Sequence, residues 1–213
     1  LSHMSISSAV VTSRTSLRTR LAALAVGMVA AASLAAPTVA SANYVAWGTV
    51  LVPGCSWAPA YCSMGDLNVY SNGTGSQDQP GPDGMRYECV ELALRFAKVM
   101  WNIDPSVWDS DAWYMWTNGP RIASHPLVQH PNGGADGPQF GDILVFNRTS
   151  FDPSGHVAVV SGLEPGYVDI VEQNWSNSSP TGTARLPISG TYMPDRWGLP
   201  ILGWLRGGPS VGP

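Results

Sequence analysis

The stretch Glu88–Trp101, ECVELALRFAKVMW, decides the fold of this 213-residue chain. From Cys89 onward, apolar residues recur at i, i+3, i+4, i+7, i+8 and i+11, which is the spacing of one helix face. Glu91 and Arg95 stand four residues apart and are expected to form an ion pair on the other side. Asp104-Pro105 is expected to end the element. The pattern therefore predicts an amphipathic helix with a cysteine in its first turn.

Apolar, β-rich runs follow this helix. Residues 107–117 are predicted to hold a short helix, and residues 118–139 to be loop-like. Strands are expected at Asp142–Phe146, His156–Ser161, Tyr167–Gln173 and Ile201–Arg206. One main helix before a run of strands predicts an α+β fold with an antiparallel sheet.

The second and third of these strands are joined by the turn sequence LEPG and are expected to form a hairpin. If the turn centres on Glu164-Pro165, the numbers of paired residues sum to about 328 to 330. His156 then lies opposite Glu172 or Asn174, and it shares their face if the sum is even. A shift of the strand register by one residue would move these side chains to the opposite face of the sheet. On this pattern alone, a solvated face with a chance pair is the alternative.

Cys89, His156, Glu172 and Asn174 are the candidate catalytic residues. The first turn of a helix favours an anion such as a thiolate, which would attack a carbonyl carbon while the Cys89 backbone N–H holds part of the oxyanion. His156 would protonate the leaving amine and then activate water, and Glu172 or Asn174 would orient its ring. A buried cysteine that acts only as a small hydrophobic residue is the alternative.

The other two cysteines, Cys55 and Cys62, lie close together in a Gly-, Pro- and Ser-rich stretch. In an exported protein such a pair is predicted to form a disulfide. A zinc site completed by His125 and His130 is the alternative, although the spacing matches no standard zinc pattern. We expect neither a metal nor another cofactor.

Residues 1–42 are predicted to be a cloning remnant and a secretory signal peptide, because three arginines precede the apolar run Leu21–Ala36 and the small-residue cleavage site Ala40–Ala42. An uncleaved anchor is the alternative, but the run is shorter than the about 20 residues that span a membrane. Residues 43–84 are predicted to be an irregular segment stapled by the disulfide. Residues 85–208 are predicted to be the catalytic domain, and residues 209–213 a tail.

Charge narrows the function classes further. The leader holds 3 of the 11 basic residues and none of the 15 acidic ones, so that residues 43–213 carry a formal charge of −7. So acidic a chain is a poor partner for nucleic acid or anionic lipid. We expect a monomer that has no membrane contact after the leader is cleaved.

The chain resembles the CHAP family, the cysteine- and histidine-dependent amidohydrolases/peptidases of the papain-like clan. Five motifs carry the resemblance in family order: YECVELALRF (87–96), GDILVF (141–146), GHVAVV (155–160), VEQNW (171–175) and ILGWLR (201–206). The resemblance implies a papain-like CHAP fold, in which the catalytic helix packs on an antiparallel sheet of about five to six strands.

By motif position the resemblance makes Cys89 the nucleophile and His156 the base, with Glu172 and Asn174 as the orienting groups. It also places Tyr87 where a residue can help to bind the oxyanion. The candidate groove residues are Trp113, Trp116 and Trp175, with core filling as the alternative. Some family members bind calcium in an Asp-rich loop, but here Asp78 and Asp83 are too sparse for one.

Members of this family mostly cut peptidoglycan, as N-acetylmuramoyl-L-alanine amidases or as stem or cross-bridge endopeptidases. A smaller branch cleaves glutathionylspermidine, but the predicted export favours the wall. The resemblance therefore implies a secreted or wall-associated enzyme whose partner is peptidoglycan or its peptide fragments, and whose intermediate is a Cys89 thioester. The alternatives are a non-catalytic wall-binding or surface module on the same fold, or a secreted lysin or toxin against competing cells.

Overall fold

The helix α2, Cys89–Trp101, is the central helix of the fold. The computed structural model describes residues 44–75, 79–108, 111–178 and 180–208, all within the compact unit Ser41–Pro213. Glu88 precedes α2 with extended backbone, and Asn102 ends it in the left-handed region with φ 54°. The helix thus ends at Trp101, as predicted, and the Asn102 N–H satisfies carbonyls of its last turn before Asp104-Pro105 is reached.

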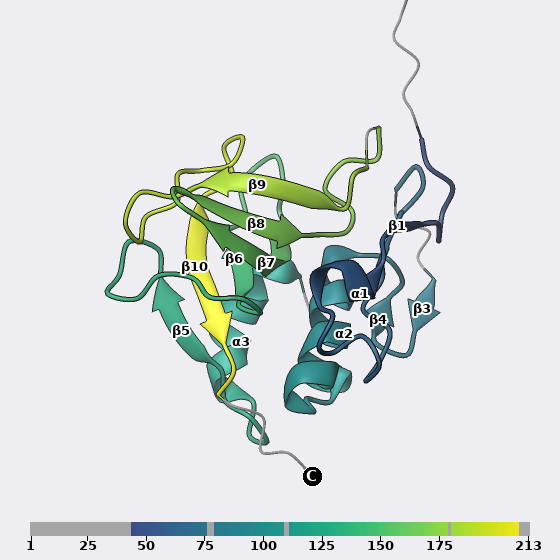
Figure 1. Ribbon diagram of the computed structural model, residues 1–213, viewed down its shortest axis with the longest axis horizontal. Coiled ribbons are helices and arrows are strands. Elements are labelled where there is room, and N and C mark those ends of the chain that lie inside the picture. Colours follow the sequence, from purple (N-terminus) through teal and green to yellow (C-terminus); the bar gives the residue numbers. More distant parts are fainter. Residues whose placement is uncertain (1–43, 76–78, 109–110, 179, 209–213) are drawn as a thin grey trace, which may run out of the picture. The chain divides into compact units, whose positions relative to one another are not determined.

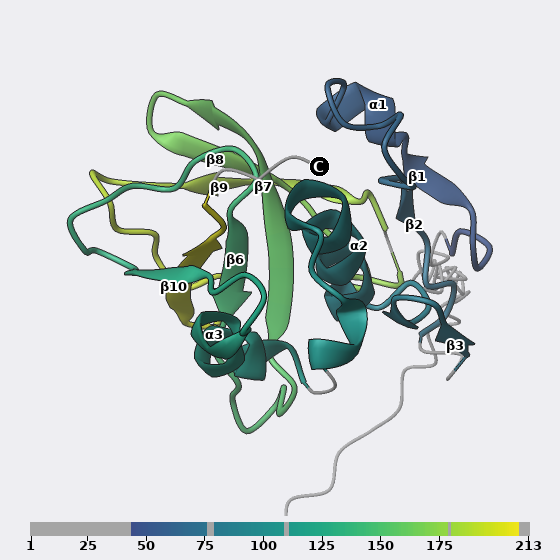
Figure 2. The same cartoon turned by 90° about the horizontal axis from the view of Figure 1, so that it is seen from below.

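One six-stranded antiparallel sheet forms the other half of the fold (Figure 1), and α2 lies alongside its strand β7 (Figure 2). The expected α+β architecture is thus confirmed. In spatial order the strands are β5 (Val128–Pro131), β10 (Ile201–Arg206), β6 (Ile143–Phe146), β7 (His156–Glu164), β8 (Tyr167–Val171) and β9 (Thr183–Pro187).

Both faces of the central strands are buried. Ile143, Val145, Val157 and Val159 belong to the core between sheet and helix, together with Leu92 and Phe96 of α2. The alternate residues of β6 and β7 pack into a second core on the opposite face, which includes Leu144, Phe146, Ala158, Val160 and Trp204. Burial on both sides explains why these strands appear in the sequence as continuous apolar runs.

The predicted hairpin is formed by β7 and β8, and a β-bulge sets its register. Glu164 pairs with Tyr167, so that Pro165 and Gly166 form the turn one position later than expected. The register shifts between Val160 and Gly162, and beyond this bulge Val159 pairs with Val171. The extra residue gives an even register at this end of the hairpin, which is the case in which the sequence placed His156 and Glu172 on one face. It therefore puts Glu172 on the same face as Ala158 and His156.

The two edge strands, β5 and β9, were not expected as strands. β5 lies inside the stretch predicted to be loop-like, and β9 has no β-rich run. Both are mostly exposed, with Leu186 the buried residue of β9. Backbone pairing with β10 and β8 forms these strands, and their composition gives no signal for it.

The described residues of the segment 43–84 form more regular structure than expected. They contain β1 (Val50–Val52), α1 (Gly54–Trp57), β2 (Val69–Tyr70) and β3 (Pro80–Gly81), with β4 (Gly84–Met85) next along the chain. Trp57, Leu67 and Val69 are buried in the core beneath α2. The segment predicted to be irregular thus carries short helices and strands and contributes to the core, and the predicted Cys55–Cys62 disulfide is present.

Short helices fill the stretch between α2 and β5. They are η1 (Pro105–Trp108), η2 (Ala112–Tyr114), α3 (Met115–Asn118) and η3 (Gly119–Arg121), where one short helix was predicted. The described residues contain no helix long and apolar enough to cross a membrane. The predicted signal peptide, residues 1–42, and the predicted tail, residues 209–213, lie outside the described residues.

The disulfide gives a first testable prediction. Replacing both Cys55 and Cys62 with serine is expected to lower the free energy of unfolding by about 2 kcal/mol, because the bridge closes a short loop. Urea denaturation of the variant and the parent protein measures this difference. Intact mass of the parent protein should be lower by two hydrogens than that of its reduced form, and free thiols at both positions would contradict the pairing.

Candidate active site

Cys89 is the first residue of α2 and is half-buried. Its backbone N–H is one of the first four of the helix, which have no carbonyl partner within the helix. These free N–H groups and the helix dipole favour negative charge at this position. Cys89 is therefore a free thiol in a place suited to a thiolate.

Tyr87 lets the chain enter the helix by a sharp turn. Its φ of 64° lies in the left-handed region, which non-glycine residues rarely adopt. Its ring packs 4.5 Å from that of Trp47 and 4.8 Å from that of Tyr70, centroid to centroid. The ring is not part of the cleft wall described below. Aromatic packing thus places the Tyr87 ring against residues 47 and 70, and the role expected for Tyr87 in binding an oxyanion stays a prediction.

His156, the first residue of β7, meets Glu172 just after β8. The imidazole Nε2 and the Glu172 Oε2 lie 3.0 Å apart, and both side chains are buried. Cys89 lies close enough to His156 for the two groups to interact electrostatically, and both residues line the same cleft. Since Glu172 occupies Nε2, the nitrogen left for the cysteine is Nδ1. His156 thus stands between the thiol and the carboxylate.

Burial alone would lower the pKa of His156, but its two polar neighbours reverse the direction. The charge and hydrogen bond of Cys89, followed by those of Glu172, raise the pKa from 6.5 to about 9. The ring is therefore protonated at neutral pH. Because the folded-state pKa is the higher one, the stabilising contribution of His156 is complete below about pH 6.5 and is lost as the pH rises through about 9.

The pKa of the Glu172 carboxylate is shifted in the opposite direction, to a lower value. Burial would raise its pKa, but hydrogen bonds and charges from His156 and Arg196 lower it below the ordinary 4.5. Its contribution to stability is therefore present above about pH 4.5 and is lost as the pH falls through the lowered pKa. Arg196 donates to both carboxylate oxygens, at 2.6 and 2.8 Å. Arg196 had no signal in the sequence, because it lies in a Gly- and Pro-rich loop 24 residues beyond its partner.

Asn174 lies close to this group but has another partner. Its Nδ2 donates to Glu88 Oε2 at 2.6 Å, and the second Glu88 oxygen accepts from Asn72 Nδ2 at 3.0 Å. Of the two predicted orienting residues, Glu172 is therefore the one that contacts the imidazole. Asn174 instead fixes the carboxylate that stands immediately before Cys89.

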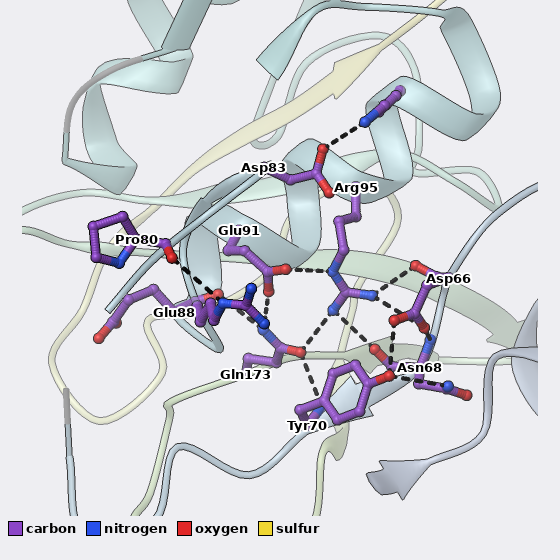
Figure 3. A network of polar contacts seen from close by, with 11 residues as sticks. Asp66, Asn68, Tyr70, Pro80, Asp83, Glu88, Glu91, Arg95 and Gln173 are labelled. Atoms are coloured by element: carbon purple, nitrogen blue, oxygen red, sulfur yellow. Dashed lines mark hydrogen bonds and ion pairs between the residues drawn. The ribbon is translucent and has the colours of Figure 1, made fainter. Parts of the chain in front are cut away.

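A buried network connects the strand end to the start of the helix (Figure 3). Gln173 Nε2 donates to the Glu88 carbonyl and to Glu91 Oε2, while its Oε1 accepts from Arg95 and from the Tyr70 N–H. Arg95 also pairs with Glu91 at 2.6 Å. The expected Glu91–Arg95 pair thus forms, but it is buried, because the N-terminal segment covers this side of the helix.

Cys89 and His156 line one cleft of about 1100 Å³, together with Asn174 and Trp175. Trp175 belongs to this wall and stays a candidate groove residue. Trp113 packs against Tyr114 and Arg148, and Trp116 packs against the helix-side core. These contacts favour the core-filling alternative for Trp113 and Trp116.

Sequence reasoning missed two exposed aromatic residues of the cleft wall. Trp197 is 82% exposed and Phe151 is 66% exposed, and both line the cleft. The wall also carries the carboxylates of Asp104, Asp111 and Asp152. Such a wall repels an anionic group and offers apolar surface for contact at its edge.

The metal alternatives find no support in the described part of the chain. Cys55 and Cys62 are bonded to each other and cannot ligate zinc, and no cluster of three His, Cys, Asp or Glu side chains forms a metal site among the described residues. Asp83 forms an ion pair with Lys98 at 2.9 Å. Asp78, the other candidate calcium ligand, lies outside the described residues.

Comparison with known proteins agrees with this geometry. Residues 80–174 match the sequence model of the CHAP domain. Endolysin PlyTW of Staphylococcus phage Twort is 26% identical over 100 residues, which cover 43% of this chain and 20% of the endolysin. The chain thus spans about a fifth of the length of that relative.

Two solved structures are similar over part of the chain. The crystal structure of Ly7917 with the hydrolysing product of MDP is 21% identical, covers 57% of this chain and 54% of its own, and has a TM-score of 0.41. A further crystal structure of Ly7917 is 20% identical with the same coverage and a TM-score of 0.36.

The raised pKa of His156 is directly testable. The ring is expected to be protonated at pH 7.5 and to titrate near pH 9, followed by ¹⁵N–¹H NMR of the imidazole nitrogens. In Cys89→Ala the pKa should fall, because the strongest raising contribution is removed. The signals of His125 and His130 serve as internal controls. A neutral ring at pH 7.5 in the parent protein would contradict the ion pair.

Proposed function

Since residues 80–174 form a CHAP domain, we propose that this protein is a cysteine-dependent peptidoglycan hydrolase that cleaves an amide bond through a thioester on Cys89. The observation that carries the proposal is the chain of contacts from Cys89 through His156 to Glu172, at one wall of a cleft large enough for a peptide. The relation to a phage endolysin supports a wall substrate.

The reaction begins with the thiolate–imidazolium pair. The Cys89 sulfur attacks the carbonyl carbon of the scissile amide, and the oxygen becomes an oxyanion that accepts a hydrogen bond from the Cys89 N–H. His156 gives its Nδ1 proton to the leaving nitrogen, and the C–N bond breaks. The products of this half-reaction are a free amine and a thioester on Cys89.

Water completes the cycle. The now neutral His156 removes a proton from a water molecule, which attacks the thioester carbonyl. The C–S bond breaks, the product leaves as a carboxylic acid, and the sulfur regains the negative charge that the imidazolium balances. Throughout, Glu172 keeps Nε2 occupied, so that Nδ1 stays directed at the sulfur and the substrate.

We further propose that the enzyme acts outside the cell, after loss of the leader predicted for residues 1–42. The acidic chain and the acidic wall of the cleft are compatible with a peptide substrate and disfavour nucleic acid. A non-catalytic binding module on the same fold would have no need of a protonated histidine paired with a free cysteine.

The variant Cys89→Ala tests the nucleophile. Hydrolysis of purified peptidoglycan should become undetectable, because no thioester can form, while the thermal unfolding midpoint should stay within a few degrees of the parent value. Hydrolysis that persists would disprove the role of Cys89. A parent protein that binds walls without releasing fragments would favour the binding module.

Mass spectrometry of the fragments from defined peptidoglycan identifies the bond. Release of the peptide stem from the lactyl group indicates an N-acetylmuramoyl-L-alanine amidase. New termini within the stem or the cross-bridge indicate an endopeptidase. Comparison of walls from the producing organism with walls from other bacteria separates wall remodelling from attack on competitors.

The exposed aromatic Trp197 provides a test of the cleft. Trp197→Ala is expected to raise KM roughly 2- to 10-fold with little change in kcat, because an aromatic contact with bound substrate contributes about 0.5–1.5 kcal/mol. Tyr192 is also exposed, at 53%, and is not part of the cleft wall. Tyr192→Ala is therefore the matched control and should leave KM unchanged.

A further inference from the structure

We propose that Arg196 is a positioning residue of this active site, which acts on His156 through Glu172 and through Trp175. The kinetic part of this inference rests on the proposed hydrolase function, whereas its spectroscopic and alkylation readouts do not. Arg196 lies in the loop between β9 and β10, far from α2, β7 and β8 in sequence. No motif of the chain includes it.

The first contact of Arg196 is a two-pronged hydrogen bond to the orienting carboxylate. Its two terminal nitrogens donate to Glu172 Oε2 at 2.6 Å and to Oε1 at 2.8 Å. Oε2 is also the atom that contacts His156 Nε2 at 3.0 Å. A carboxylate held at both oxygens by a planar guanidinium has a fixed orientation, and its remaining acceptor direction is set for the imidazole.

The second contact of Arg196 is with an aromatic ring of the active-site wall. The guanidinium carbon lies 3.6 Å from the centroid of the Trp175 ring. Trp175 in turn meets the His156 ring edge to face, with centroids 4.9 Å apart. Arg196 therefore braces the imidazole through two neighbours, one ionic and one aromatic.

The charges around His156 are a third reason to assign a positioning role to Arg196. The charged groups placed against His156 are Cys89 from α2 and Glu172 from the end of β8, with Arg196 behind the carboxylate. Its other ring neighbours, Phe146 and Trp175, are uncharged. The series His156, Glu172, Arg196 thus alternates in sign. Without Arg196, the largely buried Glu172 would lose one of the two cations that keep it ionised.

Arg196 contacts Glu172 and Trp175 but does not line the large cleft. The residues that line that cleft include Trp175 and Trp197 but not Arg196, which lines an adjoining pocket of about 230 Å³ together with Glu172. Its side chain is only 12% exposed. Its loss should therefore change the chemical step more than the binding of substrate.

The test uses two variants. Arg196→Met removes both the charge and the two-pronged hydrogen bond to Glu172, whereas Arg196→Lys keeps the charge but not the two-pronged geometry. In Arg196→Met, kcat at pH 7 should fall roughly 10- to 100-fold, since misplacement of a reacting group by about 1 Å can cost 100-fold, while KM stays within about twofold. Arg196→Lys should recover part of kcat. Equal losses in both variants, or a loss confined to KM, would overturn the proposal.

A second readout does not depend on the substrate. The rate of Cys89 alkylation by iodoacetamide is measured against pH, together with the NMR titration of His156. In Arg196→Met the alkaline transition should move to lower pH, as in Glu172→Gln, because the carboxylate no longer supports the imidazolium. An unchanged transition would overturn the proposal. So would a transition at higher pH, which would mean that the carboxylate stays in place without its fork.

Arg206 supplies a control matched in geometry and burial. It forms the same kind of fork with Asp142, at 2.8 and 2.6 Å, and Asp142 is 1% exposed. This pair lies at the opposite end of β6 from Phe146, which pairs with His156. Arg206→Met should therefore destabilise the fold comparably but leave the alkaline transition and kcat of the folded protein unchanged.

The double variant Glu172→Gln with Arg196→Met tests whether Arg196 acts through Glu172. Its alkaline transition should match that of Glu172→Gln alone, because the ionic route from Arg196 is then already interrupted, and the uncharged Trp175 does not replace it. An additive shift of the transition would overturn the route through the carboxylate. If the parent protein hydrolyses no peptidoglycan, the proposed function fails, while the alkylation and NMR comparisons still decide the role of Arg196.

Discussion

The geometry of the candidate site depends on one buried side chain, Gln173. Its two amide N–H groups donate to the Glu88 carbonyl and to Glu91. Its amide oxygen accepts from Arg95 and from the Tyr70 N–H, so that all of its hydrogen-bonding positions are used. These partners belong to the start of α2 and to the N-terminal segment, while Gln173 itself follows Glu172. A buried amide with all of its hydrogen bonds formed tolerates little displacement, because no water is available to replace a hydrogen bond that is broken. The thiol of α2 and the imidazole of the sheet are thereby held in register.

The side chains next to Gln173 along the chain divide the remaining tasks. Glu172 faces the opposite side of the strand and holds the imidazole, Asn174 holds Glu88, and Trp175 packs between His156 and Arg196. Four consecutive residues thus connect the end of β8 to His156, Glu88 and Arg196. Alternation along an extended strand accounts for Glu172 and Gln173, and the left-handed backbone of Asn174, with φ 54°, redirects the chain after them.

Sequence reasoning predicted the parts of the fold whose signal is local. The apolar period of residues 89–100 predicted α2, and the β-rich runs around the turn LEPG predicted the hairpin of β7 and β8. The Cys55–Cys62 pair followed from spacing and predicted export. The edge strands β5 and β9 escaped prediction because backbone pairing with a neighbour forms them. The burial of the Glu91–Arg95 pair escaped for a similar reason, since a distant segment covers it.

By itself the sequence determined which chemical groups are present and which of them share a local element: a thiol at a helix start, and an imidazole across a hairpin from a carboxylate. Tertiary structure decided which of these groups meet. A β-bulge chose the face of Glu172, Gln173 set the helix against the strand, and a loop 24 residues away brought Arg196 to the carboxylate. The physical reason is that periodicity and turn chemistry act over a few residues, whereas buried polar partners are selected by the folded chain as a whole.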